Sequence, residues 1–286
     1  CFSTRLKIII ITYLPVGIGK EVALLMAMEG AKVVVNDIGT DSDGTRGADR
    51  VVNEIKEAKG TAVASYDSVV SMAGGESIIK TAISSFGRID ILVNTAGNFF
   101  MRPTVDYTEA DWDAIMDVHL KGLFACTQAA IIEMIKQKSG GRIINISSEG
   151  AYLEPEMMKG GAAIAYATAK AGVLGFSRAL SIEMQEHGIT VNAISPHATT
   201  ALFGGGGKAP VSPVGPGPEY VAPIIAYLAT DEAKDITGQI FFSMGGEIRV
   251  FAPPMLKGGA HQHLYKKGKW TVDELIDIVP QLVEMF

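Results

Sequence analysis

The chain has 286 residues, of which 48% are hydrophobic and 20% are charged, a balance typical of a globular protein with a substantial core. The formal net charge is −6 and the sequence contains no basic block, which argues against a nucleic-acid partner. No uninterrupted apolar run reaches the roughly 20 residues that cross a bilayer, so no membrane partner is expected. Cys1 and Cys126 form neither a disulfide framework nor a metal-binding spacing, and they favour a reducing, cytoplasmic compartment.

Short apolar runs alternate with helical patterns along most of the chain. The expected strands are residues 7–12, 31–37, 61–66, 89–94, 142–147, 190–195 and 239–243. The expected helices are residues 19–29, 47–58, 77–86, 109–136, 165–187 and 218–230. Several of the runs are nearly continuous Ile, Val and Leu, as in strands buried on both faces. The alternation predicts an α/β fold, with a single doubly wound, Rossmann-type parallel sheet and helices on both faces.

No linker divides the chain, and a single domain over residues 1–286 is expected. The Gly/Pro-rich stretch 204–218 is predicted to be a mobile substrate loop, because helix and strand patterns resume after it. Residues 253–286 are predicted to be a C-terminal extension with an amphipathic helix. His261 and His263 lie in this extension without further ligands nearby in sequence, so surface histidines are expected there rather than a metal site.

Two glycines follow the first expected strand, where the next helix begins. Thr12 ends the strand, and Gly17, Ile18 and Gly19 open the helix. In an open parallel sheet, ligands bind beyond the carboxyl ends of the strands. The free N–H groups and partial positive charge of a helix N-terminus suit a pyrophosphate there. A glycine pair alone is weak evidence, because many helices begin with one.

An acidic residue, Asp37, closes the second expected strand, 20 residues after Gly17. A carboxylate at that point can bind both hydroxyls of an adenosine ribose and would repel a 2′-phosphate, which favours NAD over NADP as the cofactor. The alternative is that Asp37 is a turn residue before Gly39.

Further candidate cofactor residues lie at the ends of other expected strands. The segment "NTAG" supplies Asn94, Ala96 and Gly97. The small residues of this segment would let the chain pass close beneath an adenosine. Asp67 is a candidate acceptor for the adenine amino group, with a role as a turn acid as an equal alternative. Pro196 directly follows the sixth expected strand and is assigned to the same site.

The segment "YATAK" places Tyr166 and Lys170 four residues apart, hence on one face of the expected helix. A tyrosine titrates near pH 10, and a neighbouring ammonium lowers that value toward a usable proton carrier. Upstream, "INISS" ends a strand at Ser147 and Ser148, and a hydroxyl there could donate to a carbonyl oxygen as charge develops on it.

Taken together, these motifs make the chain similar to the short-chain dehydrogenase/reductase family, whose pattern is TGxxxGxG, an acid after the second strand, NNAG, a serine and YxxxK. The matching positions are Thr12, Gly17, Gly19, Asp37, Asn94–Gly97, Ser148, Tyr166 and Lys170. The resemblance implies that Tyr166 is the acid/base, that Lys170 holds the nicotinamide ribose and that Ser148 orients the substrate.

Three features depart from the family pattern. Tyr13 stands where the family has its first glycine, and Pro15 follows, so residues 1–16 hold either a locally altered turn or an imperfect record. His119 stands where the family has a catalytic asparagine, either as a structural histidine or as a proton relay. Between Ser148 and Tyr166 the chain carries an insertion beside the expected substrate pocket.

His119, the stretch "AVASYDSV" and the tail segment "WTVDELIDIVPQL" narrow the resemblance. They are similar to the dehydrogenase domain of peroxisomal multifunctional β-oxidation enzymes and to single-domain bacterial relatives of that domain. This relationship implies a 3-hydroxyacyl-CoA or a similar bulky hydroxy compound as the small-molecule substrate.

The sequence therefore predicts an NAD-dependent dehydrogenase acting on a secondary alcohol. One alternative is a catalytically silent, dehydrogenase-like subunit that supports an active partner, which Tyr13 favours and the intact downstream motifs oppose. Another is an NADPH-dependent ketoreductase of the same fold, which Asp37 opposes. The expected helices 109–136 and 165–187 carry more apolar surface than one sheet face covers, so a homo-oligomer, a tetramer as is typical of the family, is expected.

Overall fold

A computed structural model describes residues 7–12, 17–40, 43–152, 163–199 and 216–251 of the chain. These residues all belong to one compact unit, which ends at Phe251. Tyr13 and Pro15, most of the loop expected over 204–218, and the extension expected over 253–286 lie outside the described residues.

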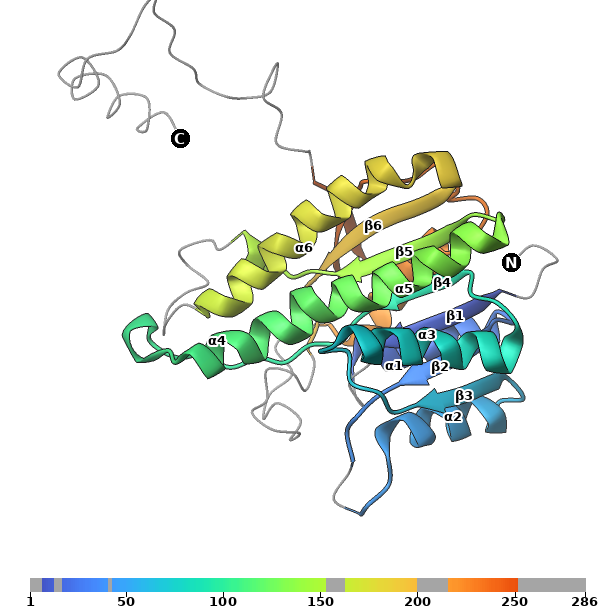
Figure 1. The fold of residues 1–286 in the computed structure, drawn as a ribbon, viewed down its shortest axis with the longest axis horizontal. Coiled ribbons are helices and arrows are strands. Elements are labelled where there is room, and N and C mark those ends of the chain that lie inside the picture. Colours follow the sequence, from blue (N-terminus) through green and yellow to red (C-terminus); the bar gives the residue numbers. More distant parts are fainter. Residues whose placement is uncertain (1–6, 13–16, 41–42, 153–162, 200–215, 252–286) are drawn as a thin grey trace, which may run out of the picture. The chain divides into compact units, whose positions relative to one another are not determined.

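The described residues form one sheet of eight strands in the order β3-β2-β1-β4-β5-β6-β7-β8 (Figure 1). The first seven strands are parallel, and β8 pairs antiparallel with β7. The strands are β1 (Ile8–Thr12), β2 (Lys32–Asn36), β3 (Thr61–Ser65), β4 (Ile91–Asn94), β5 (Gly141–Ile146), β6 (Ile189–Pro196), β7 (Ile240–Met244) and β8 (Glu247–Val250). The strand order changes direction between β1 and β4, which is the switch point where such sheets bind ligands.

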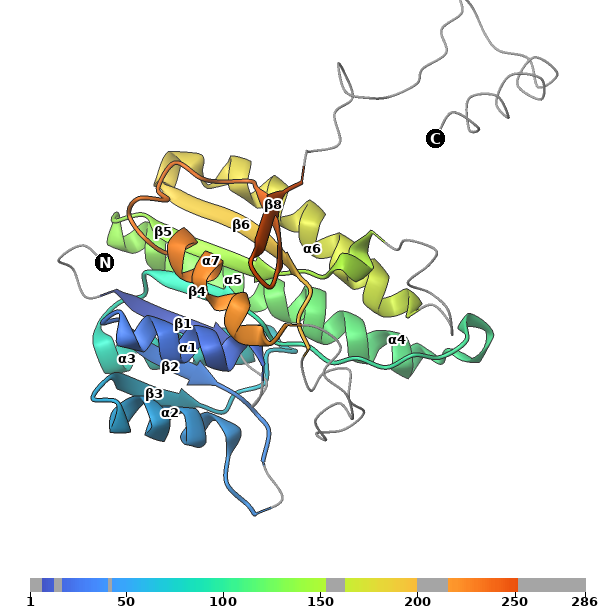
Figure 2. The same ribbon diagram turned by 180° about the vertical axis from the view of Figure 1, so that it is seen from behind.

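Helices cover both faces of the sheet, as the sequence predicts. Figure 1 shows one face, covered by α3 (Met72–Phe86), α4 (Glu109–Met116), α5 (Gly122–Gln137) and α6 (Ile164–Glu183). Figure 2 shows the other face, covered by α1 (Ile18–Met28), α2 (Gly47–Glu57) and α7 (Ala222–Leu228). The fold is therefore the expected Rossmann-type arrangement, with one antiparallel strand added at its edge.

The alternation of side chains along β1 builds a core on each face of the sheet. Ile9 and Ile11 pack in the cluster that includes α1, α2 and α7, whereas Ile8 and Ile10 pack in the cluster that includes α3 and α5. All four are buried because successive residues of a strand point to opposite faces. This explains why the strand reads as an unbroken apolar run in the sequence.

The structure differs from the predicted elements in two details. Strand β8 was not expected, and it adds one antiparallel strand beside β7 to the predicted parallel sheet. Helix α3 begins at Met72, five residues before its expected start, with the Ser71 side chain accepting from the Gly74 backbone N–H. A Cβ on Gly75 would lie 2.6 Å from the Ala125 backbone, so this glycine permits close packing of α3 on α5 rather than ending the helix.

The helix expected over residues 109–136 forms, but its hydrogen-bonding pattern changes in the middle. Between α4 and α5 lies a π-helical turn, η2 (Asp117–Lys121). Over residues 109–137, an 18-residue window is apolar enough to cross a membrane by length and composition, yet 56% of that window is buried within the fold. In this position the helix serves as a core helix packed on the sheet and on α3.

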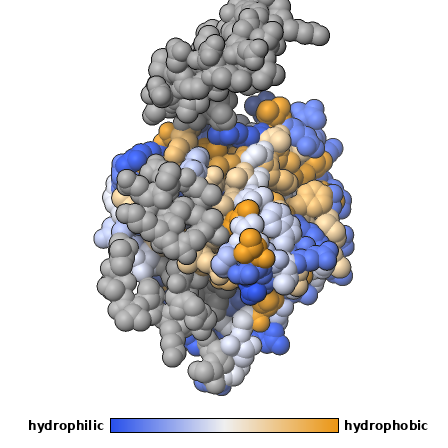
Figure 3. Space-filling model, turned by 90° about the vertical axis from the view of Figure 1, so that its left-hand side faces the viewer, coloured by the Kyte–Doolittle hydropathy of each residue, from blue (hydrophilic) through white to orange (hydrophobic). Residues whose placement is uncertain are grey.

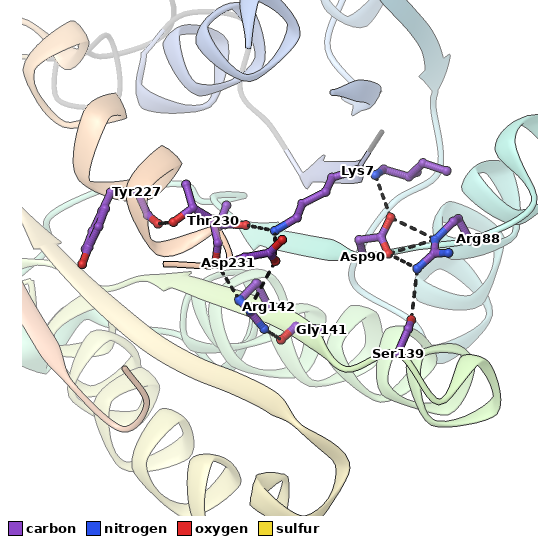
Figure 4. Close-up of polar contacts among 11 residues, drawn as sticks. Lys7, Arg88, Asp90, Ser139, Gly141, Arg142, Tyr227, Thr230 and Asp231 are labelled. Carbon is purple, nitrogen blue, oxygen red and sulfur yellow. Dashed lines mark hydrogen bonds and ion pairs between the residues drawn. The ribbon is translucent and has the colours of Figure 1, made fainter. Parts of the chain in front are cut away.

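A network of charged side chains joins segments at the starts of the strands, on the side of the sheet opposite their carboxyl ends (Figure 4). The Nζ atom of Lys7 lies 2.7 Å from Asp231 and donates to the carbonyl of Ala229. Arg142, only 9% exposed, donates from Nε to the carbonyl of Thr230, and burial lowers the pKa of its guanidinium. The network ties the segment after α7 to β1 and β5, so we regard it as structural.

Candidate active site

A row of polar side chains crosses the sheet where five parallel strands end. Ser65, Asn36, Thr12, Asn94 and Asn145 are register partners on β3, β2, β1, β4 and β5, and all five are buried. Sequence reasoning selected only Thr12 and Asn94. The missed residues share a readable signal, because each is the polar residue at or near the end of an apolar run. Figure 3 views this side of the molecule, where apolar and polar residues are mixed on the described surface.

Hydrogen bonds join this row to the helices beneath it. The Asn94 amide donates to Asn145 Oδ1 at 2.9 Å and to Thr127 Oγ1 at 3.0 Å. The Asn145 amide in turn donates to Ser177 Oγ on α6 at 2.9 Å. A satisfied buried network of this kind is rigid, so it holds the end of β4 and the start of the "NTAG" segment in a fixed position.

The switch point is built as a nucleotide site requires. Thr12 Oγ1 accepts from the backbone N–H groups of Thr95 and Ala96, at 3.2 and 3.3 Å, and joins β1 to the segment after β4. Gly17 caps α1 with φ +129° and ψ −154°, a conformation that side-chain-bearing residues avoid. Ile18 begins α1, and Gly19 is buried in its first turn, so the N-terminus of α1 lies at the edge where the strands end.

The two predicted acidic cofactor residues also serve the local structure. Asp37 follows β2, is only 3% exposed, and accepts from the Gly39 backbone N–H at 2.9 Å. That hydrogen bond is the turn contact of the alternative interpretation, and it does not test the ribose role. Asp67 accepts from Ser77 Oγ at 2.8 Å, as a turn acid would, and its role toward adenine stays a prediction.

Tyr166, Lys170 and Ser148, predicted from separate segments, come together at this edge. Tyr166 and Lys170 lie on α6, with Lys170 Nζ 5.6 Å from the centre of the Tyr166 ring. Ser148 precedes the short 3₁₀ turn η3 (Glu149–Ala151), and its side chain lies near enough to that of Tyr166 to lower the pKa of the tyrosine by hydrogen bonding. The Ser148 Oγ also accepts from the Gly150 backbone N–H at 3.1 Å, which orients it.

Burial controls the protonation of the Tyr166–Lys170 pair. It raises the pKa of Tyr166 to about 12, while the hydrogen bond from Ser148 lowers that pKa and the Glu149 carboxylate raises it further. Burial also lowers the pKa of Lys170 to about 7, and Lys170 Nζ donates to the Ile146 carbonyl at 2.8 Å. The sequence predicted that the ammonium would lower the pKa of the tyrosine. The pKa of Tyr166 instead lies above its ordinary value, because burial disfavours the phenolate, and burial disfavours the ammonium of Lys170 as well.

His119 lies on the π-helical turn η2 and faces the ring of Tyr166. The two rings meet edge to face, with centres 5.3 Å apart. His119 Nε2 lies 3.1 Å from the backbone nitrogen and 2.8 Å from the backbone oxygen of Asn98. Burial, followed by the charge of Lys170, lowers the pKa of His119 to about 3, so its imidazole is neutral near pH 7. The structural bond to backbone is thus present, and the relay role stays open.

Gly97 is required by the close approach of His119. A Cβ at position 97 would lie 2.7 Å from His119 Cε1, which is closer than side chains pack.

Predicted cofactor residues and predicted catalytic residues meet in a small cavity of about 10 Å³, close to the size of one water molecule. Its lining includes Thr12, Asn94, Ala96, His119 and Lys170. Pro196 lies apart from this cavity, at the end of β6, where it pairs with Ser243 of β7.

Comparison with known proteins agrees with this combination of fold and site. The family model for short-chain dehydrogenases matches residues 7–203. A crystal structure of a short-chain dehydrogenase from Mycobacterium avium has a TM-score of 0.83 and 35% identity, and covers 97% of this chain and 94% of that one. The chain therefore belongs to the short-chain dehydrogenase/reductase family of oxidoreductases.

Two relatives narrow the comparison further. The chain is 39% identical over 240 residues to the peroxisomal multifunctional enzyme type 2 of Drosophila melanogaster, a match that covers 80% of this chain but 37% of that protein. It is also 39% identical over 243 residues to a 3-oxoacyl-[acyl-carrier-protein] reductase of a Synechocystis species, covering 81% of this chain and 93% of that protein. The chain thus spans about a third of the multifunctional relative and nearly all of the reductase.

Proposed function

We propose that this protein is an NAD-dependent oxidoreductase that transfers a hydride between a secondary alcohol or its ketone and nicotinamide, with Tyr166 as the acid/base. The observation that carries the proposal is the joint placement of Tyr166, Ser148 and Lys170 at the carboxyl edge of the sheet, beside the glycine-opened helix α1. A purely structural protein would not need Ser148, from a separate segment, to meet Tyr166 and Lys170 of α6 at that edge.

The residues at the switch point fit a dinucleotide. The positive φ of Gly17 brings the backbone and the N-terminus of α1 to the place where a pyrophosphate binds. Asp37 stands where it can accept from ribose hydroxyls, and its negative charge disfavours a 2′-phosphate. Gly97 and Ala96 are small residues, so the segment after β4 can pass close beneath the adenosine. When bound, the nicotinamide supplies the hydride acceptor or donor.

Within this proposal the chain's own groups move a proton at the substrate oxygen. Tyr166 gives its hydroxyl proton to the oxygen during reduction and takes it back during oxidation. Ser148, which lies beside Tyr166, turns its hydroxyl to donate toward the same oxygen as charge develops there. When the Lys170 amine is protonated, its charge favours the phenolate form of Tyr166, and the ammonium would anchor the ribose. A positive charge brought to this edge would lower the pKa of Tyr166 from about 12, toward the working range.

Apolar side chains beside Tyr166 support a hydroxyacyl substrate. Phe99 contacts the Tyr166 ring edge to face, with centres 5.0 Å apart, and Phe100 stacks on Tyr107. Met116 and Leu120 pack against the same cluster. This surface suits an acyl chain better than a small polar alcohol. The name of the 3-oxoacyl-[acyl-carrier-protein] reductase relative concerns an acyl substrate of this kind. We therefore propose 3-hydroxyacyl thioesters and related bulky hydroxy compounds as the substrate class.

A panel of 3-oxoacyl and 3-hydroxyacyl thioesters, assayed with NADH, NADPH and their oxidised forms, tests the function. We expect turnover with NADH, and Tyr166→Phe should reduce it by about 10²–10⁴-fold while the cofactor still binds. Binding of NADH is measured separately by fluorescence titration. Turnover of Tyr166→Phe close to that of the native protein would refute the acid/base role. Failure of NADH to bind at all would favour the silent-subunit alternative.

We further propose that the protein works in the cytoplasm as a homotetramer. Phe124 and Ile132 on α5 and Ile182 on α6 are large apolar side chains that stay 43%, 47% and 72% exposed in the isolated chain. Exposed apolar residues on two long helices are typical of surfaces that pack against another copy.

A further inference from the structure

An acid and a histidine form a pair at the mouth of the site. Glu149 directly follows Ser148 in η3, and His197 directly follows Pro196 at the end of β6. The Nδ1 atom of His197 is in direct contact with Oε1 of Glu149. Both side chains are about one-third exposed, and 48 residues separate them in sequence. The pair therefore joins the turn that carries Ser148 to the edge of the sheet.

The His197 side of this pair is held by the sheet itself. Its backbone N–H donates to the carbonyl of Ser243 on β7 at 2.9 Å. On the other side, the backbone N–H groups of Ala151 and Tyr152 donate to the carbonyls of Ser148 and Glu149, which closes η3 into a tight turn. A contact that fixes Glu149 thus also fixes the position of Ser148.

The same turn lies directly against the ring of Tyr166. A Cβ on Gly150 would lie 3.4 Å from Tyr166 Cε1 and 3.4 Å from Ser148 Oγ, and η3 packs on α6. The Glu149 carboxylate is thereby placed close enough to Tyr166 to raise its pKa. Among the described residues, the charged or titratable groups near this turn include Glu149, Tyr152 and His197, together with His119, Lys170 and Arg178 on the elements around it.

We propose that Glu149, anchored by His197, is a positioning residue for proton transfer at Tyr166: the pair holds Ser148 against the tyrosine hydroxyl, and the Glu149 charge keeps that hydroxyl protonated. This inference rests on the proposed function and concerns the regulation of the same site. A negative charge beside a phenol disfavours the phenolate. Glu149 consequently extends the pH range over which Tyr166 donates its proton to a carbonyl, toward the alkaline side.

The charge half of the proposal is tested with Glu149→Gln, which keeps the shape and an oxygen that can accept a hydrogen bond from His197. We expect the alkaline limb of the kcat/KM profile for carbonyl reduction to move to lower pH by about 0.5–1 unit. The matched control is Glu186→Gln, which alters the acid of a similar pair, Glu186 and His187, 3.5 Å apart on the surface after α6. The control profile should coincide with that of the native protein. A Glu149→Gln profile that also coincides with it would overturn the proposal.

The positioning half is tested at His197. His197→Ala removes the anchor and should lower kcat by about 3–10-fold, the loss expected of a loosened hydrogen bond of about 1 kcal/mol. His197→Gln retains a donor to Glu149 and should restore most of that loss. Equal kcat values in the native protein and His197→Ala would overturn the anchor role. Thermal unfolding of each variant separates this loss from loss of folding.

A substrate-free readout distinguishes failure of this inference from failure of the proposed function. The ultraviolet difference absorbance of tyrosinate between the native protein and Tyr166→Phe follows the ionisation of Tyr166 alone. In the Glu149→Gln background the same difference should appear at lower pH. An unshifted ionisation would refute the inference even if the enzyme is active. A shifted ionisation without any turnover would support the inference and refute the proposed reaction.

Discussion

Replacing Gly97 by alanine would force two neighbouring parts of the site apart. The added Cβ would stand 2.7 Å from His119 Cε1, about 0.7 Å short of ordinary contact, which begins near 3.4 Å. The imidazole has little room to retreat, because it is only 2% exposed and Nε2 is held by the backbone of Asn98. Overpacking of this kind costs about 1–3 kcal/mol. For a domain of this size we therefore expect a fall in Tm of about 2–10 °C.

The same displacement separates the two possible roles of His119. A ring pushed away from Tyr166, now 5.3 Å centre to centre, would lose a proton-relay geometry, and turnover would fall by about 10–100-fold. If His119 is only structural, Gly97→Ala lowers the melting temperature while the turnover of the folded protein stays near the native value. Both kinetics and calorimetry are therefore needed on the same preparation.

Two comparisons make the Gly97 experiment decisive. Gly175→Ala on α6 is the matched control, because a Cβ there meets nothing within 4 Å, and it should leave the Tm unchanged or raise it. The second comparison is the double variant Gly97→Ala with His119→Asn, whose smaller side chain relieves the overlap. We expect a coupling free energy of at least about 1 kcal/mol between positions 97 and 119. A melting temperature of Gly97→Ala equal to that of the Gly175→Ala control would refute the steric argument.

Two further predictions concern the cofactor and assembly. Asp37→Asn keeps the acceptor for the Gly39 N–H but removes the negative charge. The ratio of NADPH to NADH affinity should therefore rise by at least about tenfold, equivalent to about 1.4 kcal/mol. An unchanged ratio in fluorescence titrations would contradict the assignment of Asp37. Sedimentation of the native protein at micromolar concentration should show a tetramer, and Phe124→Asp with Ile132→Asp on α5 should dissociate it; a native species of 30.3 kDa alone would rule out the assembly.

The parts of the fold that the sequence predicted are those in which the local pattern and the tertiary environment agree. Buried parallel strands must be apolar on both faces, so the run from Ile8 to Ile11 identified β1 without further information. Strand β8 is only four residues long, and most of its side chains are exposed, so it forms no buried apolar run that the sequence could show. A signal was nevertheless present, because Gly245 and Gly246 separate β7 from β8 as the two turn residues of a hairpin, and Gly245 has φ +55°.

The site was predictable where motif and strand end coincide, and less so where the chemistry depends on contacts between distant segments. Spacing along one helix placed Tyr166 and Lys170 together, and the end of β5 placed Ser148 beside them. Spacing could not reveal the contact between Glu149 and His197, since only the order of strands β5, β6 and β7 brings those positions together. The π-helical turn at His119 was likewise hidden, because one extra residue in a turn leaves no mark in a continuous helical pattern.

Charge states were the least predictable property of the site, and the reason is physical. From spacing alone, Lys170 is a cation that should stabilise the phenolate of Tyr166. Burial acts on both groups at once, lowering the pKa of Lys170 to about 7 and raising that of Tyr166 to about 12. Near neutral pH the phenol is therefore protonated, and the amine holds its proton less firmly than an exposed lysine does. Desolvation is a property of the assembled fold, because it is supplied by η2, η3 and α6 packing around the pair. Near neutral pH the Tyr166 hydroxyl is therefore a proton donor. Positive charge brought to the carboxyl ends of the strands favours its conversion to an acceptor, and the negative charge of Glu149 opposes that conversion.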